Sequence, residues 1–171
     1  MTPEIEALRA NETLLSPLFD EMELKFVDDP EWREPSNISY LNEQDRANPH
    51  IMANVEAMER TNAMISWFGR DREGFLGLWR GPTRTAIERS PVVRFDTECM
   101  YEICARAVAD YIALENRDSF EEARDLLRET GLSVLDGHRA VWASVEGMTE
   151  PKDLQKAFYT EGCAKRGVAA Q

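Results

Sequence analysis

Histidine and cysteine are scarce in this chain of 171 residues. The two histidines, His50 and His138, are far apart and belong to no HxxxH or HExxH pair, so they predict no metal site. The three cysteines, Cys99, Cys104 and Cys163, are odd in number and have no CxxC spacing, which indicates neither a disulfide framework nor a zinc knuckle. We therefore expect no metal and no cofactor, and thiols that behave as small apolar side chains.

Membrane segments and common catalytic motifs are missing as well. The sequence contains no run of about eighteen apolar residues, and its N-terminus lacks the basic-then-apolar order of a signal peptide. We therefore expect a soluble, cytoplasmic protein with no membrane partner. No GxSxG, GxGxxG or GxxxxGK[ST] motif is present, and nothing local supports a Cys-His pair. The sequence predicts no catalytic residue, although a hydrolase with converging carboxylates stays open as a less favoured hypothesis.

Negative charge is abundant, with a formal net charge of -12. Residues 1–60 contain fourteen acidic and five basic residues (-9), whereas residues 61–171 contain eighteen and fifteen (-3). This field argues against nucleic acid or an anionic membrane as the partner. Much of the acidity lies in DEMELKFVDDPEWRE, residues 20–34. That segment is either a solvated face that keeps the protein soluble or a docking surface for a basic partner.

The first third of the chain predicts two helices on either side of a polar loop. Thr2 and Pro3 are typical of a helix start, and Ser16-Pro17 predicts an interruption of that helix. Residues 28–49 are polar, with three prolines and little periodicity, which indicates mostly loop. Asn48-Pro49 is a second start signal, and the apolar spacing that follows predicts a helix over about 50–60.

The middle of the chain has the short, alternating pattern of a β-meander. Asp71 to Gly74 predicts a hairpin turn between the first two strands, and Gly77 in mid-strand indicates a bulge or the close approach of another element. Large apolar residues on both faces of this hairpin indicate a central position in the sheet. The four predicted strands are NAMISWFGR (62–70), GFLGLWRG (74–81), VVRFD (92–96) and CMYEI (99–103).

Helical spacing returns after this meander. It begins at Ala105, and Ser119 with Glu122 forms a capping-box pattern for a helix that stops at Gly131. Residues 138–146 fit a helix or a strand, and Thr149 with Pro151 predicts the start of a last helix.

This order of elements predicts an α+β fold. It consists of a single, mainly antiparallel sheet with its central meander at about residues 62–104, packed with N-terminal and C-terminal helices. We expect one domain over residues 1–171. Its part from about 118 to 171 is expected to be a helical extension.

The segment WFGRDREGFLGLWRG, residues 67–81, is open to three interpretations. Its aromatic residues interleaved with arginines are compatible with a ligand pocket, with a surface for single-stranded nucleic acid, or with a core hairpin that has arginines at its ends. The acidic net charge disfavours nucleic acid. We therefore interpret the segment as the central hairpin, with its tryptophans mainly in the core.

Residues 61–115 resemble the middle of the SUKH superfamily, the Smi- and Knr-like proteins. In that pattern an aromatic-Phe-Gly step is followed by an acidic turn, a second strand, a Pro-Val-Val strand that ends in an acid, and a helix. The corresponding segments here are Trp67-Phe68-Gly69, Asp71 to Gly74, Phe75 to Trp79, Pro91 to Asp96 and Ala105 to Leu114.

The resemblance implies a non-catalytic α+β protein. Many bacterial members are immunity proteins that bind and occlude a secreted toxin, for example an effector of type VI secretion, and others are regulators that bind different partners. We therefore expect an immunity protein whose cognate toxin has a basic surface, and as the alternative a regulatory or scaffold module. The residues predicted to contact the partner are Asp28, Asp29, Glu31, Trp32 and Glu34, where an aromatic residue lies among carboxylates.

Overall fold

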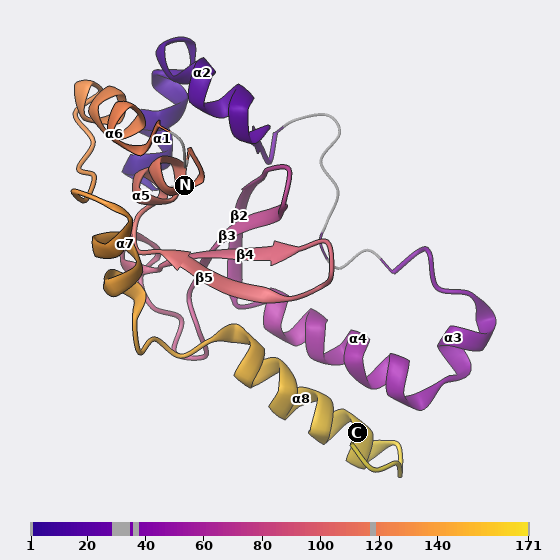
Figure 1. Ribbon diagram of the computed structural model, residues 1–171. Helices are drawn as coiled ribbons and strands as arrows, with labels where there is room; N and C mark the ends of the chain where they lie inside the picture. Colours follow the sequence, from indigo (N-terminus) through magenta and orange to yellow (C-terminus); the bar gives the residue numbers. More distant parts are fainter. Residues whose placement is uncertain (1, 29–34, 36–37, 117–118, 171) are drawn as a thin grey trace.

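The computed structural model describes residues 2–28, 35, 38–116 and 119–170 (Figure 1). Within these residues the chain forms eight α-helices and a single five-stranded antiparallel sheet, which confirms the predicted α+β class. The helices are α1 (Pro3–Ala10), α2 (Glu12–Met22), α3 (Glu43–Ala47), α4 (Pro49–Asn62), α5 (Val108–Glu115), α6 (Phe120–Glu129), α7 (His138–Val145) and α8 (Pro151–Lys165). The strands are β1 (Lys25–Phe26), β2 (Ile65–Arg70), β3 (Gly74–Trp79), β4 (Val92–Asp96) and β5 (Tyr101–Ala105).

The strands lie in the sheet in chain order, and each neighbouring pair is antiparallel. The predicted hairpin forms β2 and β3, and β3 is the central strand. A bulge in β2 lies between Trp67 and Gly69, so that Phe68 has no partner in the register. A Cβ on Gly77 of β3 would lie 2.2 Å from Cγ2 of Ile65. The predicted close approach at Gly77 is therefore confirmed, because only glycine fits there.

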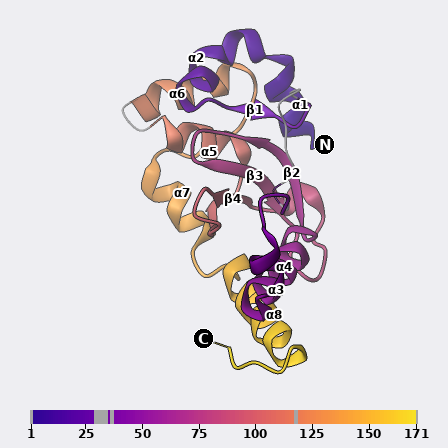
Figure 2. The same ribbon diagram turned by 90° about the vertical axis from the view of Figure 1, so that its right-hand side faces the viewer.

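Helices cover both faces of the sheet, as Figures 1 and 2 show from two directions. On one face α1, α2, α5, α6 and α7 pack against the sheet around Leu76 and Leu78, and we call this the first core. On the other face α4 and α8 pack around Trp79, Val93 and Phe95, and we call this the second core. The central position predicted for the hairpin follows from this arrangement, because β3 contributes to both cores.

The side chains of the hairpin divide between the two cores. Ile65 and Trp67 face the second core and Phe68 faces the first, as the alternation predicts. Met64 packs with the second core rather than with Phe68, because it precedes the strand and is not part of its alternation. Trp79 is buried, and its indole N–H donates a 3.2 Å hydrogen bond to the carbonyl of Thr149. The tryptophans of this segment thus belong mainly to the core.

The predicted interruption at Ser16-Pro17 is wrong. Helix α2 continues through Pro17, and the break between α1 and α2 lies at Asn11. Proline has no N–H for the carbonyl four residues earlier, which is that of Thr13. The hydroxyl of Ser16 donates to that carbonyl at 3.2 Å, so the carbonyl keeps a hydrogen bond and the helix continues.

Two short elements lie in segments that the sequence indicates as loop or charged surface. Strand β1 pairs with the end of β2, with Lys25 opposite Arg70, and adds a fifth strand to the predicted meander. Helix α3 begins in a capping box. The side-chain oxygen of Asn42 accepts a hydrogen bond from the backbone N–H of Asp45, and the carboxylate of Asp45 accepts one from the backbone N–H of Asn42. Elements of two and five residues are too short to show a period, so neither was predicted.

The C-terminal elements contribute to both cores. Phe120 of α6 and Val141 of α7 are buried in the first core, whereas Leu154 of α8 packs against the second. Residues 138–145, which fit a helix or a strand from the sequence, form helix α7. Ser119 is the N-cap of α6, but its side chain makes no capping hydrogen bond, so the predicted capping box is not formed.

Candidate binding site

Of the five residues predicted to contact a partner, only Asp28 lies among the described residues; Asp29, Glu31, Trp32 and Glu34 lie outside them. The Asp28 side chain is 59% exposed and forms an ion pair with Arg9 of α1. The Arg9 guanidinium also lies 5.5 Å from the centre of the Phe26 ring. Asp28 is therefore accessible from solvent, and its charge is balanced by a neighbour on the same surface.

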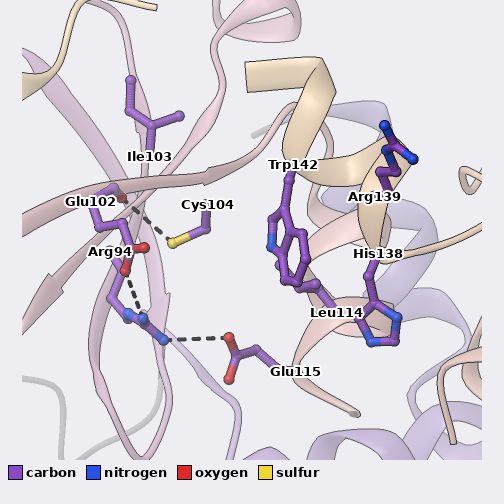
Figure 3. Close-up of a pocket in the computed structure, with 9 residues that line it drawn as sticks. All are labelled: Arg94, Glu102, Ile103, Cys104, Leu114, Glu115, His138, Arg139 and Trp142. Atoms are coloured by element: carbon purple, nitrogen blue, oxygen red, sulfur yellow. Dashed lines mark hydrogen bonds and ion pairs between the residues drawn. The ribbon is translucent and has the colours of Figure 1, made fainter. Parts of the chain in front are cut away.

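A larger feature is a cleft of about 830 Å³ between the outer strands of the sheet and two helices (Figure 3). Strands β4 and β5 form one wall, the end of α5 forms the floor, and α7 forms the opposite wall. The residues that line the cleft are Arg94, Glu102, Ile103, Cys104, Leu114, Glu115, His138, Arg139 and Trp142. They come from four elements, so only the tertiary fold brings them together.

Arg94 is the central charge of the cleft. Its Nη2 lies 2.8 Å from Glu102 and its Nη1 lies 3.4 Å from Glu115, whose side chain is 6% exposed. Burial alone would lower the pKa of Arg94, but Cys104, Tyr111, Glu102 and Glu115 outweigh it and raise that pKa. Arg94 is therefore a permanent cation, and its charge is balanced by two carboxylates of the same chain.

Cys104 is the only thiol in the cleft. Burial is the main cause that raises its pKa to about 12; the charge of Arg94 opposes this rise, and the charges of Glu102 and Glu115 add to it. Its Sγ lies 3.5 Å from the carbonyl oxygen of Glu102. Because the thiolate is the nucleophilic form of cysteine, a thiol with this pKa is inert at neutral pH.

The α7 wall presents aromatic surface to the cleft. Val141 is fully buried and attaches α7 to the first core. The His138 ring lies over Phe120, with ring centres 4.5 Å apart, and 6.0 Å from the ring of Trp142. Trp142 is 59% exposed, and Figure 3 shows its indole directed into the cleft above Leu114. An exposed indole held by a packed helix is typical of a binding residue, because tryptophan is enriched among interface residues that dominate affinity.

A histidine and a cysteine do meet elsewhere in the structure. Nδ1 of His50 lies 3.8 Å from Sγ of Cys163 and 3.1 Å from the hydroxyl of Tyr159, between α4 and α8. Cys163 has no exposed surface, so a substrate has no access to its sulfur. Gly162 is adjacent, and a Cβ there would lie 3.2 Å from the Cβ of Ala53. The arrangement is a close helix–helix contact rather than a catalytic pair.

Two features are absent from the part of the chain that the structure describes. No group of three or more His, Cys, Asp or Glu in this part is arranged to hold a metal ion. Among the same residues, no helix has the length and apolarity needed to cross a membrane.

Sequence reasoning missed the cleft. Trp142 lies in the segment whose period fits a helix or a strand, and nothing local connects it with Arg94 or Glu115. The available signal was composition, because tryptophan and arginine, here Trp142 and Arg139, are both enriched in interfaces.

Comparison with known proteins gives no match to this chain among family models, curated proteins or solved structures.

Proposed function

We propose that this chain is a non-catalytic immunity protein, which neutralises a cognate secreted toxin by binding it and occluding its active site. The observation that carries the proposal is Trp142, an indole that is 59% exposed beside an open cleft of about 830 Å³. A partner that inserts a side chain there would bury both the indole and the apolar floor. Contacts of this kind supply most of the binding energy in protein complexes.

The chemistry of the cleft favours recognition over catalysis. Its half-buried cation, Arg94, pairs with two carboxylates of the same chain, and the Cys104 thiol is protonated at neutral pH. A guanidinium and a thiol that both stay protonated supply neither a general base nor a nucleophile at neutral pH. They can still orient a bound side chain through hydrogen bonds.

The charge of the chain supports a basic partner. Its net charge of -12 attracts a protein with a positive surface, and complementary fields speed and orient docking. Many toxin domains that act on nucleic acids carry such a surface. The acidic segment that contains Asp28 would then act together with the cleft, the first through charge and the second through apolar contact.

The test is co-expression with the product of the neighbouring open reading frame, followed by purification and measurement of affinity. For Trp142→Ala we expect about 30-fold weaker binding, or about 2 kcal/mol, as for a residue that dominates an interface. Leu14→Ala is the control, because Leu14 is 46% exposed on α2 and does not line the cleft. Charge reversal of Asp28, Asp29, Glu31 and Glu34 tests the acidic segment separately.

The alternative is a regulatory or scaffold module with a partner that is not a toxin. Both functions use the same site, so the identity of the partner separates them. A neighbouring gene product that kills a host lacking this chain supports immunity. A neighbour that binds but is harmless contradicts the immunity proposal and supports the alternative.

A further inference from the structure

A second hollow surface lies against the second core, at the junction of three segments. It consists of two adjoining hollows, of about 170 and 430 Å³, which share Tyr40, Val55, Met58 and Cys99. Helix α4, the segment that leads into α3, and the β4–β5 turn surround it. We call this surface the Tyr40 groove.

The floor of the Tyr40 groove is apolar. Val55 and Met58 of α4 lie beside Phe75 and Phe95 of the sheet, and Ile38 closes the smaller hollow. An apolar cavity of about 150 Å³ is large enough to hold benzene. The smaller hollow therefore has room for one aliphatic or aromatic side chain of a partner.

The rim of the groove is exposed and partly apolar. Tyr40, which lines both hollows, is 70% exposed, and Met100, the residue after Cys99 in the sequence, is 53% exposed. Both side chains stay in water unless another molecule covers them. Tyrosine supplies large contact area at a small entropic cost, and methionine adapts its shape to different partners.

The charged groups that line the smaller hollow are acidic, and His50 lines the larger one. Glu59 and Asp96 line the smaller hollow, and Glu98 is exposed in the same turn as Asp96. No lysine or arginine lines either hollow among the residues that the structure describes. The neighbouring Arg46 donates hydrogen bonds to the carbonyls of Leu41 and Ile38, and so holds the wall of the groove in place.

We propose that the Tyr40 groove docks a basic segment of the partner that carries one apolar anchor side chain. The anchor enters the hollow between Met58 and Phe95, and flanking lysines or arginines lie beside Glu59, Asp96 and Glu98. An acidic segment would meet three like charges there, whereas a basic one is attracted to them. The inference rests on the proposed function for the identity of the partner, but the groove can be tested without it.

Cys99 gives the groove a native reporter. It is exposed and lines both hollows, while Cys104 and Cys163 are buried. Alkylation of the folded protein should therefore occur mainly at Cys99. Any molecule that occupies the groove covers this thiol and slows its modification, which mass spectrometry of the intact protein measures directly.

The probe is a soluble peptide of about twelve residues in which one leucine is flanked by lysines and serines. One matched peptide has glutamate in place of lysine, and another has serine in place of leucine. We expect the lysine–leucine peptide to slow alkylation of Cys99 at least about threefold, with the protection lost at ~0.5 M salt because exposed charges are then screened. The two matched peptides should protect far less.

Two double variants carry the same change in charge. Glu59→Lys with Glu98→Lys removes acidity at the groove, and Glu121→Lys with Glu122→Lys removes it at exposed positions of α6. Asp96 is left intact because its Oδ1 accepts from the backbone N–H groups of Glu98 and Met100 and holds the turn. Protection should be lost in the first double variant and kept in the second.

The outcomes separate this inference from the proposed function. Equal protection by the glutamate peptide, or protection that survives in the groove variant, would overturn the groove. So would a cognate complex whose affinity does not change in the groove variant, although the immunity function would then stand. Peptide protection at Cys99 with no toxin among the neighbouring gene products supports the groove and contradicts the immunity function.

Discussion

The carboxylate of Glu4 in α1 accepts a 2.9 Å hydrogen bond from the backbone N–H of Ala109, at the first turn of α5. The two residues are 105 positions apart in sequence. The N-cap residue of α5 is Ala107, which has no side-chain acceptor, so the first N–H groups of this helix need an acceptor from elsewhere. Glu4 supplies it and so joins the N-terminal helix to the start of α5, the helix whose other end forms the floor of the cleft.

We expect Glu4→Ala to lower the free energy of unfolding by about 1–2 kcal/mol, because it leaves buried N–H groups of α5 without an acceptor. Glu4→Gln keeps an oxygen at this position and should cost less at pH 7. Glu6→Gln is the matched control, because Glu6 is exposed on the same helix. Chemical denaturation measures all three variants, and equal stability of Glu4→Ala and wild type would contradict the capping role.

Glu4 should also make stability depend on pH. Burial raises the pKa of Glu4 above its ordinary value of 4.5, against the hydrogen bonds from Ala109 and Val108. The folded state therefore binds this proton more tightly than the unfolded state, and the resulting stabilisation, complete below pH 4.5, is lost as the pH rises through the raised pKa. As the pH rises above 4.5, the free energy of unfolding of the Glu4→Gln variant should fall less than that of the wild type. The Glu6→Gln variant should lose as much as the wild type does.

The phenol of Tyr111 holds the hairpin turn from the first core. It is fully buried and donates a hydrogen bond to Oδ2 of Asp71, whose Oδ1 accepts from the N–H groups of Glu73 and Gly74. We expect Tyr111→Phe to lower the free energy of unfolding by about 1–2 kcal/mol, because the half-buried Asp71 carboxylate loses the hydroxyl that donates to it. Tyr40→Phe, at a 70% exposed position, should be neutral in the same thermal and chemical unfolding measurements.

Gly77→Ala should destabilise the sheet. The added methyl group would lie 2.2 Å from Cγ2 of Ile65, which requires the hairpin to separate, at a cost of about 1–3 kcal/mol. At Gly137 a Cβ meets no atom within 4 Å, so Gly137→Ala should change stability by less than ~0.5 kcal/mol. Similar unfolding midpoints for the two variants would contradict the close packing between β2 and β3.

The exposed thiol of Cys99 should react before the two buried thiols, those of Cys104 and Cys163. With an alkylating reagent at about pH 8, we expect Cys99 to react in the folded protein and Cys104 to react only on unfolding. Burial raises the pKa of Cys104 to about 12, so its thiolate fraction at this pH is very small. Peptide mass spectrometry identifies the labelled position, and Cys99→Ser serves as the control that should show almost no labelling before denaturant is added.

Local signals in the sequence were enough to predict most of the elements. The prolines at positions 3, 49 and 151 each lie at the first position of a helix. The alternation along β4 places Val93 and Phe95 in the second core. Asp71 forms its turn with residues two and three positions away. Each of these signals involves residues only a few positions apart in the sequence. A single sequence is therefore sufficient to recognise them.

The sequence by itself thus determined the α+β class, the central hairpin and the acidic character of the chain. Only the tertiary structure shows the two candidate binding surfaces, because the cleft brings Arg94 to Trp142 and the Tyr40 groove brings Tyr40 to Cys99, residues that are far apart in the sequence. No periodicity connects residues so far apart. The degree of burial is likewise set by the packed neighbours and not by the residue itself. Burial raises the pKa of Cys104, whereas Trp142 stays exposed.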